Sequence, residues 1–285
     1  MNTILVTGSN GYLGNSFINQ YKDKYIFEEF SLLNKKIEDI NFDNISIVLH
    51  CAALVHQKVE HFYEKYYEIN VDYPLKLARL AKSSGVKQFI FISTIAVYSK
   101  DIENIYESSS CNPTTPYSKS KLDAEKKLMD LSNEIFTVSI IRPPMVYGKN
   151  APGNIDSLIK LVTTLAIIPL GKIKNKRSFV YVGNLCAMIE RIIETKKSGI
   201  FLACDDMPLS TTGLIELIAL GMGKKVYLFR LPFFKEILKW IKPSIYKRLY
   251  ESLEVNNSQT KKLLDFKNPY TVEEGMRLMM TGMDQ

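Results

Sequence analysis

Tyr117 and Lys121 are the residues whose types and spacing most clearly predict chemistry in this sequence. They lie four positions apart in the run P-Y-S-K-S-K, which good helix formers follow, so both side chains should share one helical face. A phenol with an ordinary pKa of about 10 carries protons poorly near neutrality, and a neighbouring ammonium lowers that pKa; a decrease of ~3 units corresponds to about 4 kcal/mol. The spacing therefore predicts a proton-donating Tyr117 activated by Lys121, although surface helices often show the same spacing by chance.

A further hydroxyl group follows the strand-like run at 88–93, where the sequence continues T-I-A-V from Thr94. Open parallel sheets bind their ligands at the carboxyl ends of the strands. Thr94 is therefore expected at that edge, where its hydroxyl can hold the oxygen that Tyr117 protonates. Thr94, Tyr117 and Lys121 are the predicted catalytic residues.

A glycine-rich loop, T-G-S-N-G-Y-L-G, follows the first strand-like run at 3–7 and opens directly into a helix. Gly8 permits a tight turn, Gly11 lets a pyrophosphate approach the backbone, and Gly14 allows close helix–strand packing. The loop predicts a dinucleotide site, and a tight turn without a ligand is the less favoured alternative. The residues expected to bind the cofactor here are Gly8, Asn10, Gly11, Tyr12, Leu13 and Gly14.

The end of the second strand-like run decides between NAD and NADP, because an acid there binds a free ribose hydroxyl and a base accommodates a phosphate. Here the run ends at Ser31, and Lys35 and Lys36 follow it. Glu28 and Glu29 come earlier, within the strand. The pattern leans towards NADP, with Ser31 as a cofactor-binding residue, and leaves NAD open.

Strand-like runs alternate with helical stretches along the first half of the chain, which predicts βαβ units and a parallel sheet. The expected fold class is α/β, a Rossmann-type doubly wound sheet with a smaller C-terminal lobe. Only a short strand and crossover fit between Ser31 and Ser46. We expect residues 1–146 to form the dinucleotide-binding domain, with strands near 177–204 returning to it, and 147–176 and 205–285 to form a smaller substrate-binding lobe. The strand-like runs lie at 3–7, 25–31, 46–50, 88–93, 136–141, 179–182 and 199–203.

Composition excludes several other classes of protein. The 285 residues are 46% hydrophobic, enough for a large core, and the net charge of +7 comes from lysines spread along the chain, which does not favour nucleic acid binding. The apolar stretches fall short of the roughly 20 residues that a membrane-spanning helix needs. The N-terminus has no secretory pattern, so a cytoplasmic location is expected. The four cysteines should be reduced, and His50, His56 and His61 lack metal-ligand spacing, so no metal site is expected.

These motifs, in this order, resemble the extended short-chain dehydrogenase/reductase family, and within it the NAD-dependent epimerase/dehydratase branch. The segments H-C-A-A at 50–53, N-V at 70–71, R-P-P-M-V-Y-G at 142–148 and R-S-F-V-Y-V-G-N-L at 177–185 extend the resemblance over nearly the whole chain. The resemblance implies that Asn70 braces the central helix and that Gly183-Asn184 departs from a common acidic pair. It also implies cofactor contacts from Ala52, Ala53, Tyr117, Lys121 and Pro144, and substrate contacts from Thr94, Val97, Tyr147, Asn154 and Arg177.

The resemblance implies an NAD(P)-dependent enzyme that acts on a nucleotide sugar. The favoured activity is reduction of the C4 keto group of a UDP-4-keto-6-deoxy-N-acetylhexosamine in surface polysaccharide biosynthesis, and the alternative is a UDP-sugar 4-epimerase. A dehydratase is disfavoured because no Asp-Glu pair follows Thr94. A non-catalytic dinucleotide sensor on the same fold is a remote alternative, since it would be expected to lack Tyr117 and Lys121. Members of the family commonly pair, so a homodimer is expected.

One segment, 229–250, mixes aromatic residues with lysine and arginine. Such a stripe can touch an anionic membrane, but it more often packs a helix onto its own domain. We therefore expect it to pack on the small lobe, and do not expect membrane contact.

Overall fold

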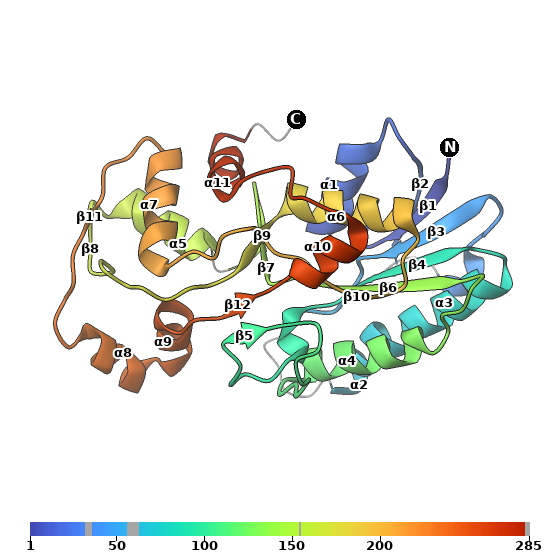
Figure 1. Ribbon diagram of the computed structural model, residues 1–285, viewed down its shortest axis with the longest axis horizontal. Coiled ribbons are helices and arrows are strands. Elements are labelled where there is room, and N and C mark those ends of the chain that lie inside the picture. Colours follow the sequence, from blue (N-terminus) through green and yellow to red (C-terminus); the bar gives the residue numbers. More distant parts are fainter. Residues whose placement is uncertain (32–35, 56–62, 154, 283–285) are drawn as a thin grey trace.

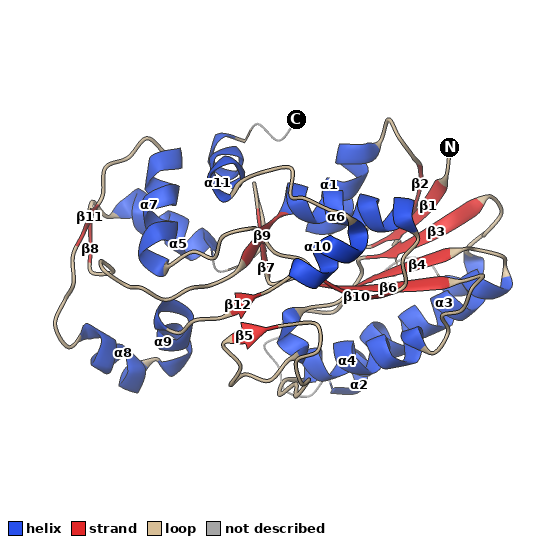
Figure 2. Cartoon of the chain, viewed as in Figure 1, coloured by secondary structure: helices blue, strands red, loops and turns tan. Residues whose placement is uncertain are grey.

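A six-stranded parallel sheet forms the centre of the computed structural model, which describes residues 1–31, 36–55, 63–153 and 155–282. The strand order is β10-β6-β4-β3-β1-β2, and all neighbours are parallel (Figure 1, Figure 2). This confirms the predicted α/β, Rossmann-type sheet. The strands are β1 (Thr3–Thr7), β2 (Ile26–Phe30), β3 (Ile45–His50), β4 (Gln88–Ile92), β6 (Thr137–Arg142) and β10 (Gly199–Leu202).

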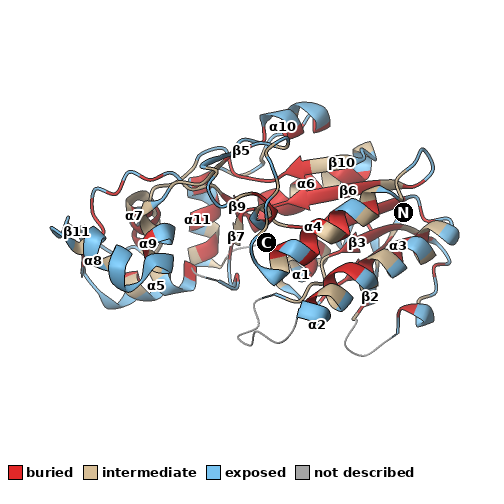
Figure 3. Cartoon of the chain, turned by 90° about the horizontal axis from the view of Figure 1, so that it is seen from below, coloured by how far each residue is buried: buried red, intermediate tan, exposed pale blue. Residues whose placement is uncertain are grey.

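Helices cover both faces of this sheet, which explains why its strands read as nearly continuous apolar runs. On one face α1 (Tyr12–Tyr21) and α6 (Val182–Thr195) pack together, and on the other α3 (Tyr73–Ser83) packs on α4 (Pro116–Met129) (Figure 1). Side chains alternate along β1 accordingly: Ile4 and Val6 belong to the α6 side, and Leu5 belongs to the α3 and α4 side. Apart from the edge strand β2, the strands of this sheet are largely buried (Figure 3).

The stretch between β2 and β3 differs from the expectation of a short strand. Its described part forms a 3₁₀ turn, η1 (Ile37–Asp39), and β3 pairs directly with β1. The segment beginning at His50 therefore follows the third strand of the chain. This arrangement keeps the sheet edge beyond β2 open, because no described strand is added there.

The second half of the chain adds three two-stranded sheets and most of the remaining helices. Of the two strands expected to return to the main sheet, only β10 joins it. The other, β9 (Phe179–Tyr181), pairs with β7 (Met145–Tyr147) instead. The other pairs are β8 (Ile167–Ile168) with β11 (Tyr227–Leu228), and β5 (Asn104–Ile105) with β12 (Glu254–Val255). The other helices and turns are α2 (Tyr63–Tyr67), η2 (Glu68–Asp72), η3 (Ile95–Val97), α5 (Ile155–Thr164), α7 (Thr211–Gly221), α8 (Phe234–Ile241), α9 (Pro243–Tyr250), α10 (Ser258–Leu264) and α11 (Val272–Thr281).

One continuous hydrophobic core joins the two halves. It contains Ile4 of β1 and Leu185 of α6, and it continues without a break to Ile215 of α7 and Met276 of α11. The exact boundary of the smaller lobe stays a prediction. None of the described helices combines the length and the apolar character that crossing a bilayer requires.

Candidate active site

The glycine loop between β1 and α1 has a geometry that only glycine allows. Gly8 has a φ of +72°, and a Cβ there would lie 2.7 Å from the amide nitrogen of Ala52. A Cβ on Gly14 would lie 2.4 Å from the carbonyl oxygen of Gly8. The turn is closed by the Gly11 amide, which donates to the Gly8 carbonyl at 2.9 Å. These contacts reproduce the roles expected of a tight turn and of close helix–strand packing.

The first turn of α1 suits an anionic group. The N-cap residue of α1, Gly11, makes no side-chain hydrogen bond to the helix, and the first turn of α1, which the structure describes in full, contains no acidic residue. The first amides of a helix point out of its N-terminus, and the helix dipole places partial positive charge at the same end. Asn10 is exposed there, and Tyr12 and Leu13 are half-buried. These residues fit the diphosphate of a dinucleotide.

The ends of β2 and β3 meet this loop. The Gly8 amide donates to the Phe30 carbonyl at 3.3 Å, which places Ser31 beside the loop, and the Cys51 amide donates to the Thr7 carbonyl at 3.0 Å. The loop therefore lies between Ser31 on one side and Ala52 and Ala53 on the other. Glu28 and Glu29 lie within β2, as expected, and Lys35 lies outside the described residues.

His50 has a structural role under this loop. Its Nδ1 lies 2.8 Å from the Thr7 hydroxyl, and its ring stacks on Phe91. Burial lowers the pKa of His50 to about 3, so the imidazole is neutral. The residues that the structure describes contain no group of three metal-ligating side chains; His56 and His61 lie outside them.

Helix α4 carries the predicted catalytic pair. Thr115 caps it, accepting a hydrogen bond from the Ser118 amide at 3.1 Å, so the helix begins at Pro116 and places Tyr117 in its first turn. Tyr117 is half-buried, and Lys121, one turn later, is buried. The Lys121 ammonium donates to the Ile92 carbonyl at 2.8 Å and lies 4.2 Å from the centre of the Phe91 ring.

The electrostatics of this pair differ from the sequence-based expectation. Burial, with a smaller contribution from Tyr66, raises the pKa of Tyr117 to about 12, and burial lowers the pKa of Lys121 to about 8. The predicted lowering of the phenol pKa by Lys121 is thus absent in this arrangement. The reason is that a buried ammonium needs an acceptor, and Lys121 finds it in the Ile92 carbonyl at the end of β4.

Thr94 lies where β4 ends, as expected. It is half-buried and caps η3, its hydroxyl accepting from the Ala96 amide at 3.1 Å. The Ile95 amide donates to the Pro143 carbonyl at 3.1 Å, so the ends of β4 and β6 meet, and α4 packs against η3. Pro144 is buried in the same segment. The structure therefore gathers the elements of Thr94, Pro144 and Tyr117 at one edge of the sheet.

A buried ion pair, absent from the sequence-based site, fixes α4 at this edge. Glu125 lies one turn beyond Lys121, and the Arg142 Nε lies 3.1 Å from both of its carboxylate oxygens. Ser93, at the end of β4, also donates to the Glu125 carboxylate. Both partners of the ion pair are almost fully buried. An acid four residues after Lys121, on the same helical face, was the available signal.

Asn70 connects the cofactor side to the catalytic helix. Its side chain accepts from the Leu54 amide at 2.8 Å and donates at 3.1 Å both to the Leu54 carbonyl and to the Ser120 hydroxyl. The loop after β3 and helix α4 are thereby held together, which is the bracing implied for Asn70.

The residues predicted to bind substrate are dispersed. Val97 is fully buried in a small hydrophobic cluster with Tyr98 and Ile105, and Tyr147, paired with Tyr181 of β9, is also fully buried. Both have a packing role in this structure, because neither side chain has surface left for a ligand. Arg177 is half-buried and donates to the carbonyls of Glu251, at 3.1 Å, and Lys247, at 3.5 Å, at the end of α9. Asn154 lies outside the described residues.

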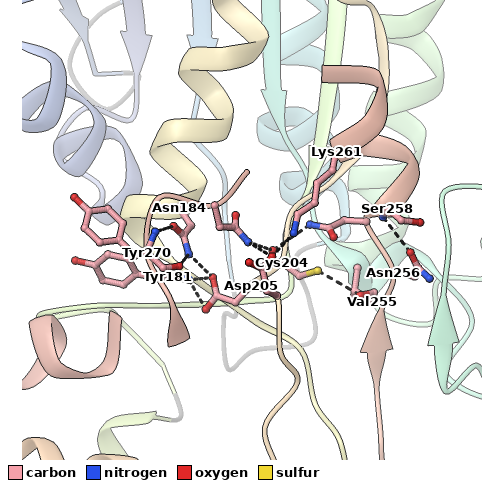
Figure 4. Close-up of polar contacts among 12 residues, drawn as sticks. Tyr181, Asn184, Cys204, Asp205, Val255, Asn256, Ser258, Lys261 and Tyr270 are labelled. Carbon is pink, nitrogen blue, oxygen red and sulfur yellow. Dashed lines mark hydrogen bonds and ion pairs between the residues drawn. The ribbon is translucent and has the colours of Figure 1, made fainter. Parts of the chain in front are cut away.

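Tyr147 belongs to a second buried polar cluster, centred on Asp205. The Asp205 carboxylate accepts from the Tyr147 hydroxyl at 2.7 Å. It also accepts from the Tyr181 amide at 3.0 Å and from the Asn184 side chain at 2.8 Å (Figure 4). Asn184 also bonds the main chain of Tyr270 in both directions. Burial raises the pKa of Asp205 above its ordinary value. Asn184, whose role the sequence left open, therefore joins α6 to the C-terminal segment.

The sequence also matches a known family over this whole region. The profile of the NAD dependent epimerase/dehydratase family covers residues 4–203, including the glycine loop, Thr94, Tyr117 and Lys121. The chain belongs to this family. It is an enzyme, and the predicted family membership is confirmed.

A 4-epimerase is among the sequence relatives of this chain, and solved structures of the same fold include epimerases and reductases. The chain is 33% identical to "UDP-glucose 4-epimerase" of Vibrio cholerae, over 96% of this chain and 93% of that protein. Its fold matches a UDP-glucuronic acid 4-epimerase from Bacillus cereus in complex with NAD, with a TM-score of 0.77, 19% identity, and 99% and 100% of the two chains covered. It also matches a dTDP-4-dehydrorhamnose reductase from Bacillus anthracis in complex with NADP, with a TM-score of 0.76, 21% identity, and 100% of both chains covered.

The cofactor of this family member is NAD or NADP, as predicted. The residues around the glycine loop fit such a group on their own geometry, because the turn excludes side chains at Gly8 and Gly14 and leads into the N-terminus of α1, where the N-cap Gly11 supplies no side-chain cap. Similarity to the two solved structures, below 25% identity, shows the fold and not the reaction.

Proposed function

We propose that this enzyme reduces the C4 keto group of a UDP-4-keto-6-deoxy-N-acetylhexosamine, in the cytoplasm, as a step of surface polysaccharide biosynthesis. The observation that carries the proposal is the end of β2, where Ser31 rather than an acid lies beside the glycine loop. This favours NADPH, the dinucleotide on which reductive biosynthesis generally draws. Burial of Tyr117 raises the pKa of its phenol, which keeps the proton that a reductase must donate.

The roles of the surrounding residues follow from their positions. The bound dinucleotide supplies the hydride. Tyr117 donates its proton to the keto oxygen, which Thr94 orients from the end of β4, and Lys121 lies one turn below Tyr117 at the cofactor side of α4. The Glu125 and Arg142 ion pair and the Asn70 contacts hold α4 in register with the strand ends. Arg177 is the proposed contact for the diphosphate of the nucleotide sugar, and a homodimer is the proposed assembly.

NADP is the proposed dinucleotide. Ser31 lies beside the glycine loop, and the two acids of β2 lie earlier in the strand. A serine at this position leaves space for a 2′-phosphate, where an acid would repel it. Lys36, which follows the strand in the sequence and is exposed, adds positive charge to this stretch of the chain.

A 4-epimerase is the second candidate function, because the relative that is 33% identical over nearly the whole chain is named as one. An epimerase regenerates its own NAD and gains by retaining it. A reductase must exchange its dinucleotide in every cycle. The two candidates therefore differ in what the purified enzyme retains and consumes.

The deciding experiment measures dinucleotide in the purified enzyme and follows NADPH and NADH absorbance with UDP- and dTDP-sugars, with and without a 4-keto group. We expect little retained dinucleotide and one reduced dinucleotide consumed per 4-keto sugar. Retained NAD, with interconversion of two 4-hydroxy sugars and no added NADPH or NADH, would establish the epimerase instead.

Tyr117→Phe should lower turnover at least about a hundredfold, because it removes the donated proton and keeps the ring. Tyr227→Phe, at an exposed position on β11, is the matched control and should leave turnover unchanged. Near wild-type turnover in folded Tyr117→Phe would remove Tyr117 from the mechanism.

A further inference from the structure

Helix α8 exposes an apolar face at the end of the molecule remote from the six-stranded sheet (Figure 1). Trp240 is 86% exposed and Phe233 is 77% exposed, and Ile237 and Ile241 are exposed as well. Positions 233, 237, 240 and 241 recur at helical spacing, so they form one stripe, which we call the α8 face. No residue of α8 is buried. The expectation that this segment packs its apolar stripe onto the small lobe is therefore wrong for the α8 face.

Side chains of α8 outside this stripe attach the helix to the protein. Phe234 is partly buried against the main hydrophobic core, and α8 packs on α9. Lys239 lies 5.6 Å from the centre of the Tyr246 ring, which is buried in α9. The helix is thus held in place with its α8 face directed outward, so no refolding is needed to present it.

The charges of segment 229–250 indicate which kind of partner can bind the α8 face. The segment 229–250 carries six basic residues and one acid, Glu236, a net charge of 6 − 1 = +5 within a chain of net +7. A second copy of the chain on this face would bring two such segments together, and the repulsion opposes that pairing. A soluble anion would satisfy the charge but not the apolar side chains. The basic residues are Arg230, Lys235, Lys239, Lys242, Lys247 and Arg248.

We propose that α8 docks the enzyme on an anionic membrane surface. An exposed apolar stripe with Trp and Phe, on a helix whose other side carries lysines, is the pattern of a helix that lies in the plane of a lipid interface. Trp240 and Phe233 enter the headgroup region, and the lysines contact anionic headgroups. α9 links the docked helix to the proposed diphosphate contact, because the Arg177 guanidinium donates to the carbonyls of Lys247 and Glu251 at the end of α9.

Trp240 is the only tryptophan of the chain, so its fluorescence reports the docking without a label. The full-length protein is titrated with vesicles of phosphatidylcholine containing phosphatidylglycerol, and binding is measured in parallel by sedimentation. We expect a blue shift of the emission and co-sedimentation. Affinity should be at least about tenfold weaker for vesicles of phosphatidylcholine alone or at high salt.

Two sets of variants test the face and the charges separately. Ile237→Asp should weaken vesicle binding at least about tenfold, because it places a charge in the apolar stripe. The matched control is Leu220→Asp, at an exposed position of α7. Replacing Lys235, Lys239 and Lys242 with Gln should abolish the preference for phosphatidylglycerol, whereas the same change at the exposed Lys22, Lys126 and Lys262 should not. Circular dichroism and turnover of soluble substrate should stay unchanged in all of them.

Three results would overturn the proposal. The first is no shift and no sedimentation with anionic vesicles. The second is a blue shift that grows with protein concentration in the absence of vesicles, together with a dimer by light scattering, which would assign the α8 face to a second copy. The third is equal binding of Ile237→Asp and wild type. Docking is measured without catalysis, so its failure leaves the proposed reduction untouched.

Discussion

Two buried carboxylates hold this enzyme together by different means. Glu125 lies beside the predicted active site and is paired with the Arg142 guanidinium and the Ser93 hydroxyl. Asp205 lies where β7, β9 and α6 meet, and its donors are the neutral groups of Tyr147, Tyr181 and Asn184. The charge of Glu125 is balanced by that of Arg142, whereas, among the described residues, Asp205 has only neutral hydrogen-bond donors around it.

The two carboxylates should therefore respond differently when a partner is removed. Removing one member of a buried ion pair strands the other charge, which costs far more than the pair itself contributes. A carboxylate held by neutral donors loses one hydrogen bond at a time. Loss of either partner of the Glu125–Arg142 pair should therefore destabilise the position of α4 strongly. Loss of one donor to Asp205 should weaken the contact between α6 and the C-terminal segment only slightly.

Glu125→Leu should produce the largest loss of stability, ~3–5 kcal/mol, because Arg142 is left buried without its partner. Urea unfolding measures this loss, and the exposed Glu134→Leu is a control that should change little. The double variant Glu125→Leu with Arg142→Met should recover much of the loss, since no charge remains buried. If the single and double variants were equally unstable, the stranded charge would not be the cause.

Asp205→Asn should cost less, ~1–3 kcal/mol, because the new amide group faces donors such as the Asn184 side chain. Its effect should also depend on pH. Folding raises the pKa of Asp205, so the stability from the protonated carboxyl is fully present below its ordinary pKa and is lost as pH rises through the folded pKa. The advantage of wild type over Asp205→Asn should therefore be largest at acidic pH and shrink as the pH rises. Urea midpoints measured over a series of pH values test this, and a constant difference would contradict it.

The contrast also shows how far the sequence could predict this protein. Short motifs with a recognisable spacing predicted the glycine loop, Thr94, Tyr117 and Lys121. Glu125 lies on the same helical face as Tyr117 and Lys121. Their elements meet at one edge of the sheet because the carboxyl ends of parallel strands meet there. The Rossmann-type fold followed from the same alternation of strands and helices.

Features set by distant contacts could not be predicted. Asp205 meets residues 21, 24 and 58 positions away, and no local pattern encodes that meeting. The direction of the Lys121 ammonium depends on the Ile92 carbonyl, 29 positions away. The amphipathic pattern of 229–250 predicted a helix, but a pattern does not say whether its apolar face is covered, and on α8 it is not.

Tyr147→Phe should produce the smallest change and tests the stepwise nature of the Asp205 cluster most directly. It removes one donor to Asp205 and keeps the ring that packs on Tyr181, so the loss should be about 1 kcal/mol, near the usual net contribution of one hydrogen bond. The same substitution at Tyr117 removes the proposed proton donor. We therefore expect opposite outcomes, lower stability with full turnover for Tyr147→Phe, and full stability with lost turnover for Tyr117→Phe. Urea unfolding and NADPH consumption on both variants measure them. A loss of turnover in stable Tyr147→Phe would return this hydroxyl to the substrate site, where the sequence first placed it.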